Sequence, residues 1–307
     1  MAILNSKKNP AVETVEDFDA HAELVKRERR ANNVWNKLKR NKTAMFGLVI
    51  VLVMTIMAVF APVIATHDPN MIDPLNSYLG FGEQGHLLGT DEFGRDLFSR
   101  IVYGSRVSLI AAVGGVFVGG LLGILLGLIS GYKGGAVDAV IMRFMDGILA
   151  YPHILLAILL MTIMGSGLFS VVLAIGVGNI PNFARVVRGQ VMIVKNEEYC
   201  NAGRVLGISN MRLLFKHILP NTVSTVIVYI TLNVAGAIIS EATLSFLGLG
   251  ISPPTPSWGN ILRAGKDCLT TAPHIAAMSG SFILVTVLGF NLLGDGIRDV
   301  LDPKMKR

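Results

Sequence analysis

A polar and basic segment, Glu198–Pro220, lies between two long apolar stretches of the chain. A simple reversal of the chain would need only a few residues, so a plain linker explains this length poorly. The segment presents the small residues Ala202 and Gly203, against which another protein could pack closely. We therefore expect a docking surface that binds a soluble partner protein and catalyses no reaction.

Two short helices are expected to shape this docking segment. The first covers Glu198–Leu206, and the second begins at Ser209, a favourable N-cap residue, and continues to about His217. Gly207 permits a sharp turn between the two helices. Pro220 is expected to separate the segment from the apolar span that follows it.

Glu241 is the only acidic residue well inside an apolar stretch. A carboxylate costs about 2.5–3.5 kcal/mol near the middle of a bilayer and less towards its edge, so this side chain should face water or a partner group. One interpretation is a residue of a transport pathway or gate. The other, which is favoured, is a structural hydrogen bond near the outer end of its span.

Other reactive patterns are absent from the sequence. No glycine-rich loop is followed by Lys and Ser or Thr, so the chain should not hydrolyse nucleotide alone. No His or Cys spacing indicates a metal site. No Ser, His and Asp set suggests an intramembrane protease, and His153 and His217 are isolated. We expect no catalytic residue, no metal and no cofactor in this chain.

The composition indicates an all-α protein that crosses a membrane several times. Of the 307 residues, 52% are hydrophobic and only 16% are charged, and the mean hydropathy is +0.57. The apolar runs are continuous and long enough to cross a bilayer, whereas strands of a barrel would alternate apolar and polar residues. The net charge of +6 comes from basic residues that flank these runs, so nucleic-acid binding is not expected.

Six transmembrane helices are expected. They cover roughly Ala44–Ala65, Val107–Ser130, Val137–Met164, Leu168–Ala184, Thr222–Leu244 and Ile275–Leu293. Lys and Arg gather before the first span, in the docking segment and at the end of the chain. The positive-inside rule therefore places both termini and the docking segment in the cytoplasm.

The second span contains glycines at a strict spacing of four residues. They are Gly115, Gly119, Gly123, Gly127 and Gly131. This spacing places all five on one face of a helix, where another helix can approach backbone to backbone. Ordinary enrichment of glycine in membrane helices explains the register less well. The partner helix could belong to this chain or to another subunit.

The chain is expected to divide into four parts. They are 1–42, a cytoplasmic tail; 43–105, the first span and an extracytoplasmic loop; 106–301, the core, with the docking segment at about 190–220; and 302–307, a second cytoplasmic tail. The basic end of the first tail contains Val34, Trp35 and Leu38. These three residues could form the apolar face of an interfacial helix, with a solvated basic flank as the alternative.

The docking segment resembles the EAA motif of ATP-binding-cassette (ABC) importer permeases. In that motif, EAA is followed by three residues, Gly, nine residues, Ile, one residue and Leu-Pro. Here this register reads Asn201, Ala202, Gly203, Gly207, His217, Leu219 and Pro220. The Glu, the second Ala and the Ile of the motif are thus replaced, and the other positions hold.

Three longer strings resemble the peptide/nickel branch of this family. They are LLGTDEFGRDLFSRIVYGSRVSL at Leu87–Leu109, GYKGGAVDAVIMRFMDGILAYP at Gly131–Pro152 and LSFLGLGISPPTPSWG at Leu244–Gly259. They are most similar to the C-type subunit, the second permease of dipeptide and oligopeptide importers. The resemblance covers nearly all of Lys37–Arg307.

The resemblance implies a type I ABC importer permease with six helices in the bacterial inner (cytoplasmic) membrane. It also implies a heterodimer with a homologous permease, two ATP-binding subunits that carry ATP and Mg²⁺, and an extracytoplasmic solute-binding protein. The chain itself would not be an enzyme. The outer loop and Leu244–Gly259 would face the binding protein or cap the cavity.

The docking segment would be the coupling helix of this importer, seated in a groove of one ATPase. The residues that carry this contact are Glu198, Ala202, Gly203, Gly207 and Pro220. Closure of the ATPases on ATP would then switch the side of the membrane to which the substrate cavity opens.

The expected function is ATP-driven import of dipeptides or oligopeptides. An importer of nickel or another small solute in the same family is the first alternative. The spans lack a cluster of His or Met residues, which disfavours a metal substrate. A stand-alone secondary transporter would usually show more charge within the membrane or inverted repeats. A membrane-embedded enzyme would need reactive groups that the spans lack.

Overall fold

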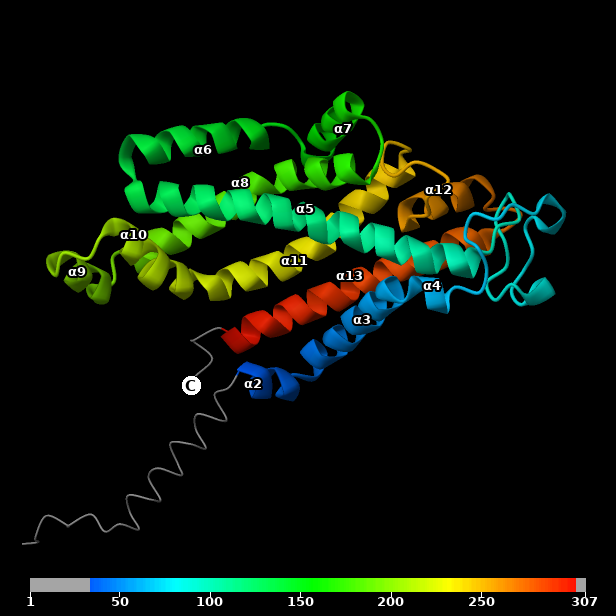
Figure 1. Cartoon of the computed structure of the whole chain (residues 1–307), viewed down its shortest axis with the longest axis horizontal. Helices are drawn as coiled ribbons and strands as arrows, with labels where there is room; N and C mark the ends of the chain where they lie inside the picture. Colours follow the sequence, from blue (N-terminus) through cyan, green and yellow to red (C-terminus); the bar gives the residue numbers. More distant parts are fainter. Residues whose placement is uncertain (1–33, 302–307) are drawn as a thin grey trace, which may run out of the picture.

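The computed structural model describes residues 34–301. Within this range the regular structure is helical, and the only β pairing is an isolated bridge between Thr90 and Asp96. Long helices run side by side, and short helices and loops lie at both ends of the bundle (Figure 1). The prediction of an all-α fold is confirmed. Most of the expected N-terminal tail (residues 1–33) and the expected C-terminal tail (302–307) lie outside the described residues.

Five helical runs in the described range are long and apolar enough to cross a membrane. They are α3 (Lys42–Val59), α5 (Leu97–Lys133), α8 (Leu168–Val194), the run Asn210–Phe246 that ends in α11 (Leu219–Phe246), and α13 (Pro273–Leu301). A sixth span exists if α6 (Gly135–Leu149) and α7 (His153–Met164) are taken together. The predicted spans therefore correspond to five continuous helices and one broken pair.

The third predicted span, Val137–Met164, is not one continuous helix. Its two halves, α6 and α7, meet at 85°. The break falls at Pro152, which has no N–H to donate and disfavours a helical conformation at Tyr151. The apolar run continues through this point, so hydropathy alone did not reveal the bend.

Two helices extend well beyond the predicted spans. α5 begins at Leu97 because the side chain of Asp96 accepts a hydrogen bond from the backbone N–H of Ser99 and caps the helix. α8 continues past Ala184 to Val194, although this part carries Arg185 and Arg188. Hydropathy marks the apolar part of a helix, and both helices continue into polar surroundings.

Shorter elements complete the described chain. They are α2 (Val34–Arg40), α4 (Ala61–Ile64), the 3₁₀ turns η1 (Pro74–Asn76) and η2 (Glu83–Gly85), α9 (Glu198–Val205), α10 (Asn210–Leu213), the π-helical turn η3 (Leu214–Ile218) and α12 (Trp258–Asp267). α2 covers the segment for which the sequence allowed two alternatives, an interfacial helix or a solvated basic flank. Its Leu38 is buried, and the helix contacts both α3 and α13.

The elements separate into two ends (Figure 1). One end holds α2, α9, α10 and the end of α13. The other holds α4, α12 and the loop that leads into α5. Both ends of the described chain thus lie at the same end as the docking segment, which is the arrangement expected if they face the same compartment.

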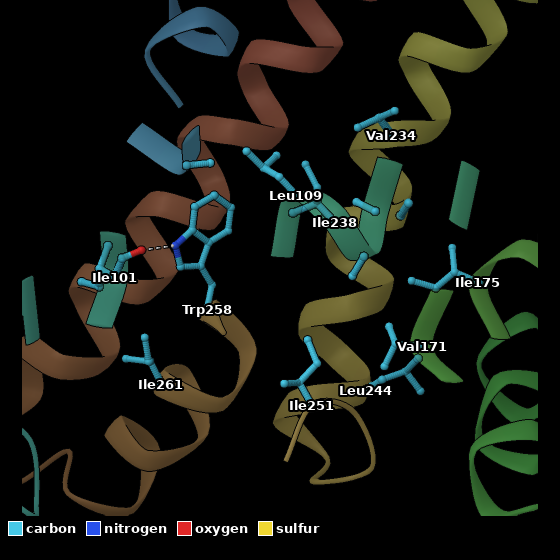
Figure 2. Close-up of a cluster of buried hydrophobic side chains, with 14 of the residues drawn as sticks. Ile101, Leu109, Val171, Ile175, Val234, Ile238, Leu244, Ile251, Trp258 and Ile261 are labelled. Atoms are coloured by element: carbon cyan, nitrogen blue, oxygen red, sulfur yellow. Dashed lines mark hydrogen bonds between the residues drawn. The ribbon is translucent and has the colours of Figure 1, made fainter. Parts of the chain in front are cut away.

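Trp258, the fully buried first residue of α12, joins this helix to α5. Its indole Nε1–H donates to the backbone oxygen of Ile101 at 3.1 Å (Figure 2). Its backbone N–H donates to Oγ of Ser108 at 3.2 Å. A buried Trp contributes a large apolar surface and needs a partner for its N–H, and both conditions are met here.

Candidate functional site

The docking segment folds as two helices joined by a tight glycine turn. α9 ends at Val205, and Gly207 follows with φ of +76°, a left-handed conformation that L side chains rarely adopt. The backbone N–H of Gly207 donates to Arg204 O and that of Ile208 to Gly203 O, each at 3.0 Å. These two hydrogen bonds form a Schellman motif, which stops the helix and turns the chain back.

An apolar tip projects from this turn. Val205 is 89% exposed and Leu206 is 81% exposed, and Met211 on α10 is 65% exposed. The opposite face of α9 is buried through Cys200 and Gly203. Exposed apolar side chains that adjoin each other at the end of a helix commonly mark a contact with another protein.

Two predicted docking residues differ in their orientation. Ala202 is exposed on α9. Gly203 instead faces Ile208 and Leu213 of the same chain, and a β-carbon added there would lie 3.3 Å from Ile208 and 3.4 Å from Leu213. Gly203 therefore shapes the segment from inside, and the exposed apolar side chains are Val205 and Leu206, which the sequence analysis did not single out.

The end of the docking segment differs from the prediction. Pro220 does not separate it from the next span, because α10, η3 and α11 continue as one helical run. Pro220 lies in the first turn of α11, where its missing N–H is tolerated. The π-helical turn precedes it, and the N–H of Leu219 donates to Leu214 O. Ser209 occupies the N-cap of α10, but its side chain makes no capping hydrogen bond.

The segment is held firmly to the bundle. The guanidinium of Arg204 donates to Lys195 O at 3.0 Å and to Asn201 Oδ1 at 2.7 Å. Tyr132 at the end of α5 donates to Asn210 Oδ1 at 2.6 Å. The buried side chains beneath it come from α5, α8 and the helical run Asn210–Phe246: Leu128, Val187, Val191, Leu213, Leu214 and Ile218. A force on the tip would therefore reach α5, α8 and the helical run that continues into α11.

All five glycines of the α5 stripe lie against α8. A β-carbon at Gly119 would lie 2.6 Å from the backbone oxygen of Gly176, and one at Gly123 would lie 2.4 Å from Cβ of Phe183. The first, fourth and fifth glycines of the stripe face Ile175, Val187 and Val191 in the same way. The helix that approaches the stripe is thus in the same chain, a choice that the sequence left open.

Glu241 is fully buried near the end of α11. Its Oε1 accepts a hydrogen bond from Ser245 Oγ at 2.8 Å. Its Oε2 has no hydrogen-bond partner among residues 34–301. The oxygen of Ser245 also accepts from the N–H of Ile251 at 3.3 Å, so the carboxyl supports the loop that follows α11. This geometry favours the structural interpretation of Glu241.

A charged cavity of about 340 Å³ lies at the end of the bundle that holds α4 and α12, and the sequence analysis missed it. The loop before α5, the segment after α11 and α12 all contribute to its wall. The carboxylate of Asp91 forms ion pairs with two arginines there. Its Oδ2 lies 2.7 Å from Arg95 Nε and 3.2 Å from Arg100 Nε. Its charged residues are Asp91, Glu92, Arg95, Arg100, Arg263 and Asp267.

A second cluster that sequence reasoning missed lies beside the start of α5. Nδ1 of His86 lies 2.8 Å and Nδ1 of His67 lies 3.7 Å from Oδ1 of Asp96. Burial alone would raise the pKa of Asp96, but hydrogen bonds from Ser99 and His86 bring this pKa below its usual value. The three groups are far apart in the sequence, so no spacing pattern could have predicted them.

Two family models match the chain. The model described as "Binding-protein-dependent transport system inner membrane component" matches residues 123–307. The model described as "N-terminal TM domain of oligopeptide transport permease C" matches residues 31–80. The first match covers the docking segment, α8, α11 and α13, and the second covers α2, α3 and α4.

Several curated proteins resemble the chain over most of its length. "Glutathione transport system permease protein GsiD" of Escherichia coli O6:K15:H31 and that of Shigella boydii serotype 4 are each 44% identical over 273 residues, 89% of this chain and 90% of theirs. The protein of the same name from Pectobacterium atrosepticum is 42% identical over 272 residues, with the same coverage.

One solved structure resembles the fold. It is described as "Inward facing conformations of the MetNI methionine ABC transporter: CY5 SeMet soak crystal form". The TM-score is 0.55 at 18% identity, over 66% of this chain and 96% of that chain. The likeness supports the helical arrangement alone.

Proposed function

Because the chain belongs to the family of binding-protein-dependent transport system inner membrane components, we propose that it carries small peptides into the cytoplasm as one permease of an ATP-driven importer. The chain is a permease subunit of an ABC importer related to glutathione and peptide transport, and it is not itself an enzyme. ABC importers work with ATPase subunits and a substrate-binding protein. ATP and Mg²⁺ would bind to those ATPases.

The proposal of a peptide substrate rests on the relatives. Permeases of glutathione transport are 44% identical to this chain over 89% of its length, and glutathione is a tripeptide. Dipeptides and oligopeptides are close to it in backbone chemistry. Import of nickel or another small solute stays the alternative within the family.

The proposed assembly follows from the two ends of the bundle. The end with α2, α9 and α10 would face the cytoplasm of a bacterial cell and receive one of two ATPases. The opposite end, with the charged cavity, would face the solute-binding protein. A homologous permease would complete a heterodimer across the membrane, with six crossings and both termini inside in this chain.

The observation that carries the coupling proposal is the apolar tip at Val205 and Leu206. These two side chains are almost fully exposed, yet the helix beneath them packs through Cys200 on a buried cluster with residues of α5, α8 and the run Asn210–Phe246. Binding of the tip in a groove of the ATPase would bury the apolar surface of Val205 and Leu206. Movement of the ATPase would then be transmitted through the docking segment to the helices of the bundle. ATP-driven movement of the ATPases would thereby shift the equilibrium between two states of the permease.

The complete importer should accumulate labelled dipeptides or tripeptides in proteoliposomes only when ATP and the ATPase subunits are present. Unlabelled peptides should compete for uptake, and Ni²⁺ should not, because a peptide site is built to recognise backbone amide and terminal groups. The assay measures uptake with and without ATP. Flux without the ATPases would favour a secondary transporter, and competition by Ni²⁺ alone would favour the metal importer.

Replacement of Gly207 by valine should weaken ATPase co-purification and lower uptake. No atom lies within 4 Å of a β-carbon built at Gly207, so the effect comes from the backbone. A β-branched residue held at φ of +76° is strained by about 1–3 kcal/mol, and the turn will relax away from it.

Gly207→Asn is the matched control for this change. Asn adds a side chain of similar size but tolerates the left-handed conformation. It should retain most of the co-purified ATPase and most of the uptake. Equal losses in the Val and Asn variants, or no loss in either, would contradict a role for this turn.

A further inference from the structure

Three potential metal ligands converge at the outer end of the bundle. They are His67, just after α4, His86 in the following loop, and Asp96 at the N-cap of α5. Their candidate ligand atoms all lie within 4.8 Å of one another. The two imidazole rings face each other, with centroids 4.6 Å apart. Three separate segments thus place two nitrogen donors and one oxygen donor around one point.

The distances suit a small transition-metal ion. Metal–ligand bonds of about 2.0–2.2 Å in a tetrahedral site put neighbouring ligand atoms about 3.4 Å apart. The separations from Asp96 Oδ1 are 2.8 Å to His86 Nδ1 and 3.7 Å to His67 Nδ1, which lie on either side of that value. Small rotations of the two rings would equalise them.

The carboxylate of Asp96 is already oriented for this role. Its Oδ2 accepts the backbone N–H of Ser99 at 2.7 Å, which fixes the carboxylate plane and leaves Oδ1 directed at the two histidines. The side chain of Asp96 is 1% exposed, and that of His67 is 38% exposed. One face of the cluster is therefore rigid and buried, and the other is open to an entering ion and a water ligand.

We propose that His67, His86 and Asp96 form a binding site for a borderline divalent transition metal, with Zn²⁺ as the representative ion. Two imidazoles and one carboxylate suit Zn²⁺, Ni²⁺ or Cu²⁺, whereas Ca²⁺ and Mg²⁺ prefer oxygen ligands alone. The bound ion ties the segment after α4 to the first turn of α5. It therefore stabilises the outer loop, independently of the transported solute.

The test is Zn²⁺ binding to the intact importer after treatment with a chelator. A fluorescent chelating dye competes for Zn²⁺, and the affinity is measured for the wild type and for His67→Gln and Asp96→Asn. Each substitution should weaken the affinity of this site at least about tenfold. Gln at position 67 replaces a partly exposed ring, and Asn at position 96 can still accept the capping hydrogen bond, so both variants should fold.

His274→Gln is the control for the loss of a histidine at the same end of the bundle. His274 packs against Phe81, with ring centroids 5.3 Å apart, and lies outside the cluster. This variant should bind Zn²⁺ as the wild type does. Co²⁺ should give visible ligand-field absorption in the wild type and in His274→Gln, and this signal should disappear in the two cluster variants.

Two results would overturn the proposal. One is an equal Zn²⁺ affinity in all four proteins, which would place any bound ion elsewhere in the importer. The other is a wild type that takes up no Zn²⁺ and shows no Co²⁺ absorption, which would make the cluster a hydrogen-bonded helix cap only. A Zn²⁺-dependent rise in the thermal midpoint that is lost in Asp96→Asn would add independent support.

Discussion

Leu206→Glu should nearly abolish ATP-driven uptake while the permease stays folded in the membrane. The side chain is 81% exposed, so the change removes little from the fold. In the proposed coupling contact it would put a carboxylate into an apolar groove, where a charge without a partner is strongly unfavourable. Loss of a central interface residue costs about 2 kcal/mol or more, which corresponds to roughly 30-fold weaker binding of the ATPase.

Leu206→Met is the matched control, because it keeps an apolar side chain of similar volume at the tip. ATPase co-purification and peptide uptake should both stay close to the wild type in this variant. The level of each permease in the membrane reports folding separately from coupling. Normal uptake by Leu206→Glu would mean that the tip does not contact the ATPase, and the coupling proposal would then have to be abandoned.

The position of the docking segment was predictable, but its exposed face was not. Its length between two apolar spans and the turn residue Gly207 are local signals. Which side of α9 faces outward depends on how Leu213 and Ile218 pack beneath it, and this packing involves α5 and α8. Gly203 therefore faces inward and Leu206 outward, although the sequence had indicated Gly203, and not Leu206, as a contact residue.

The positions of the long helices were also predictable, whereas their ends were not. Hydropathy located the apolar parts of α5 and α8 but not their ends, because both helices continue where charged residues begin. The 85° bend between α6 and α7 also had a local cause at Pro152 that apolar content concealed. Hydropathy identifies the apolar part of a helix, whether it faces lipid or other helices, whereas the ends of a helix depend on caps and prolines.

Residues that come together only in three dimensions left no signal. His67, His86 and Asp96 belong to three segments whose approach depends on how the loop between α4 and α5 returns to the start of α5. The same holds for the charged cavity, whose wall joins the loop before α5 to α12. The spacing of four along α5, in contrast, predicted the face that contacts another helix, since a helix repeats its faces over short distances.

Gly123→Ala should destabilise the protein strongly, although it adds a single methyl group. The new β-carbon would lie 2.4 Å from Cβ of Phe183 and 2.7 Å from the backbone oxygen of Ile180. Neither atom is the end of a flexible side chain, so α5 and α8 would have to move apart. Overpacking of this kind costs about 1–3 kcal/mol. The thermal midpoint of the purified importer and the amount of permease in the membrane should both fall.

Gly120→Ala tests whether position on the helix decides this effect. Gly120 lies on the same helix, but the nearest atoms to its β-carbon are ring atoms of Phe183 at 3.6 Å, an ordinary contact distance. The two variants share the same gain in helix propensity, so any difference between them comes from the contact with α8. A normal midpoint for Gly120→Ala with a low one for Gly123→Ala is the expected result. Equal midpoints in the two variants would show that the glycine stripe is not needed for close approach of the α5 and α8 backbones.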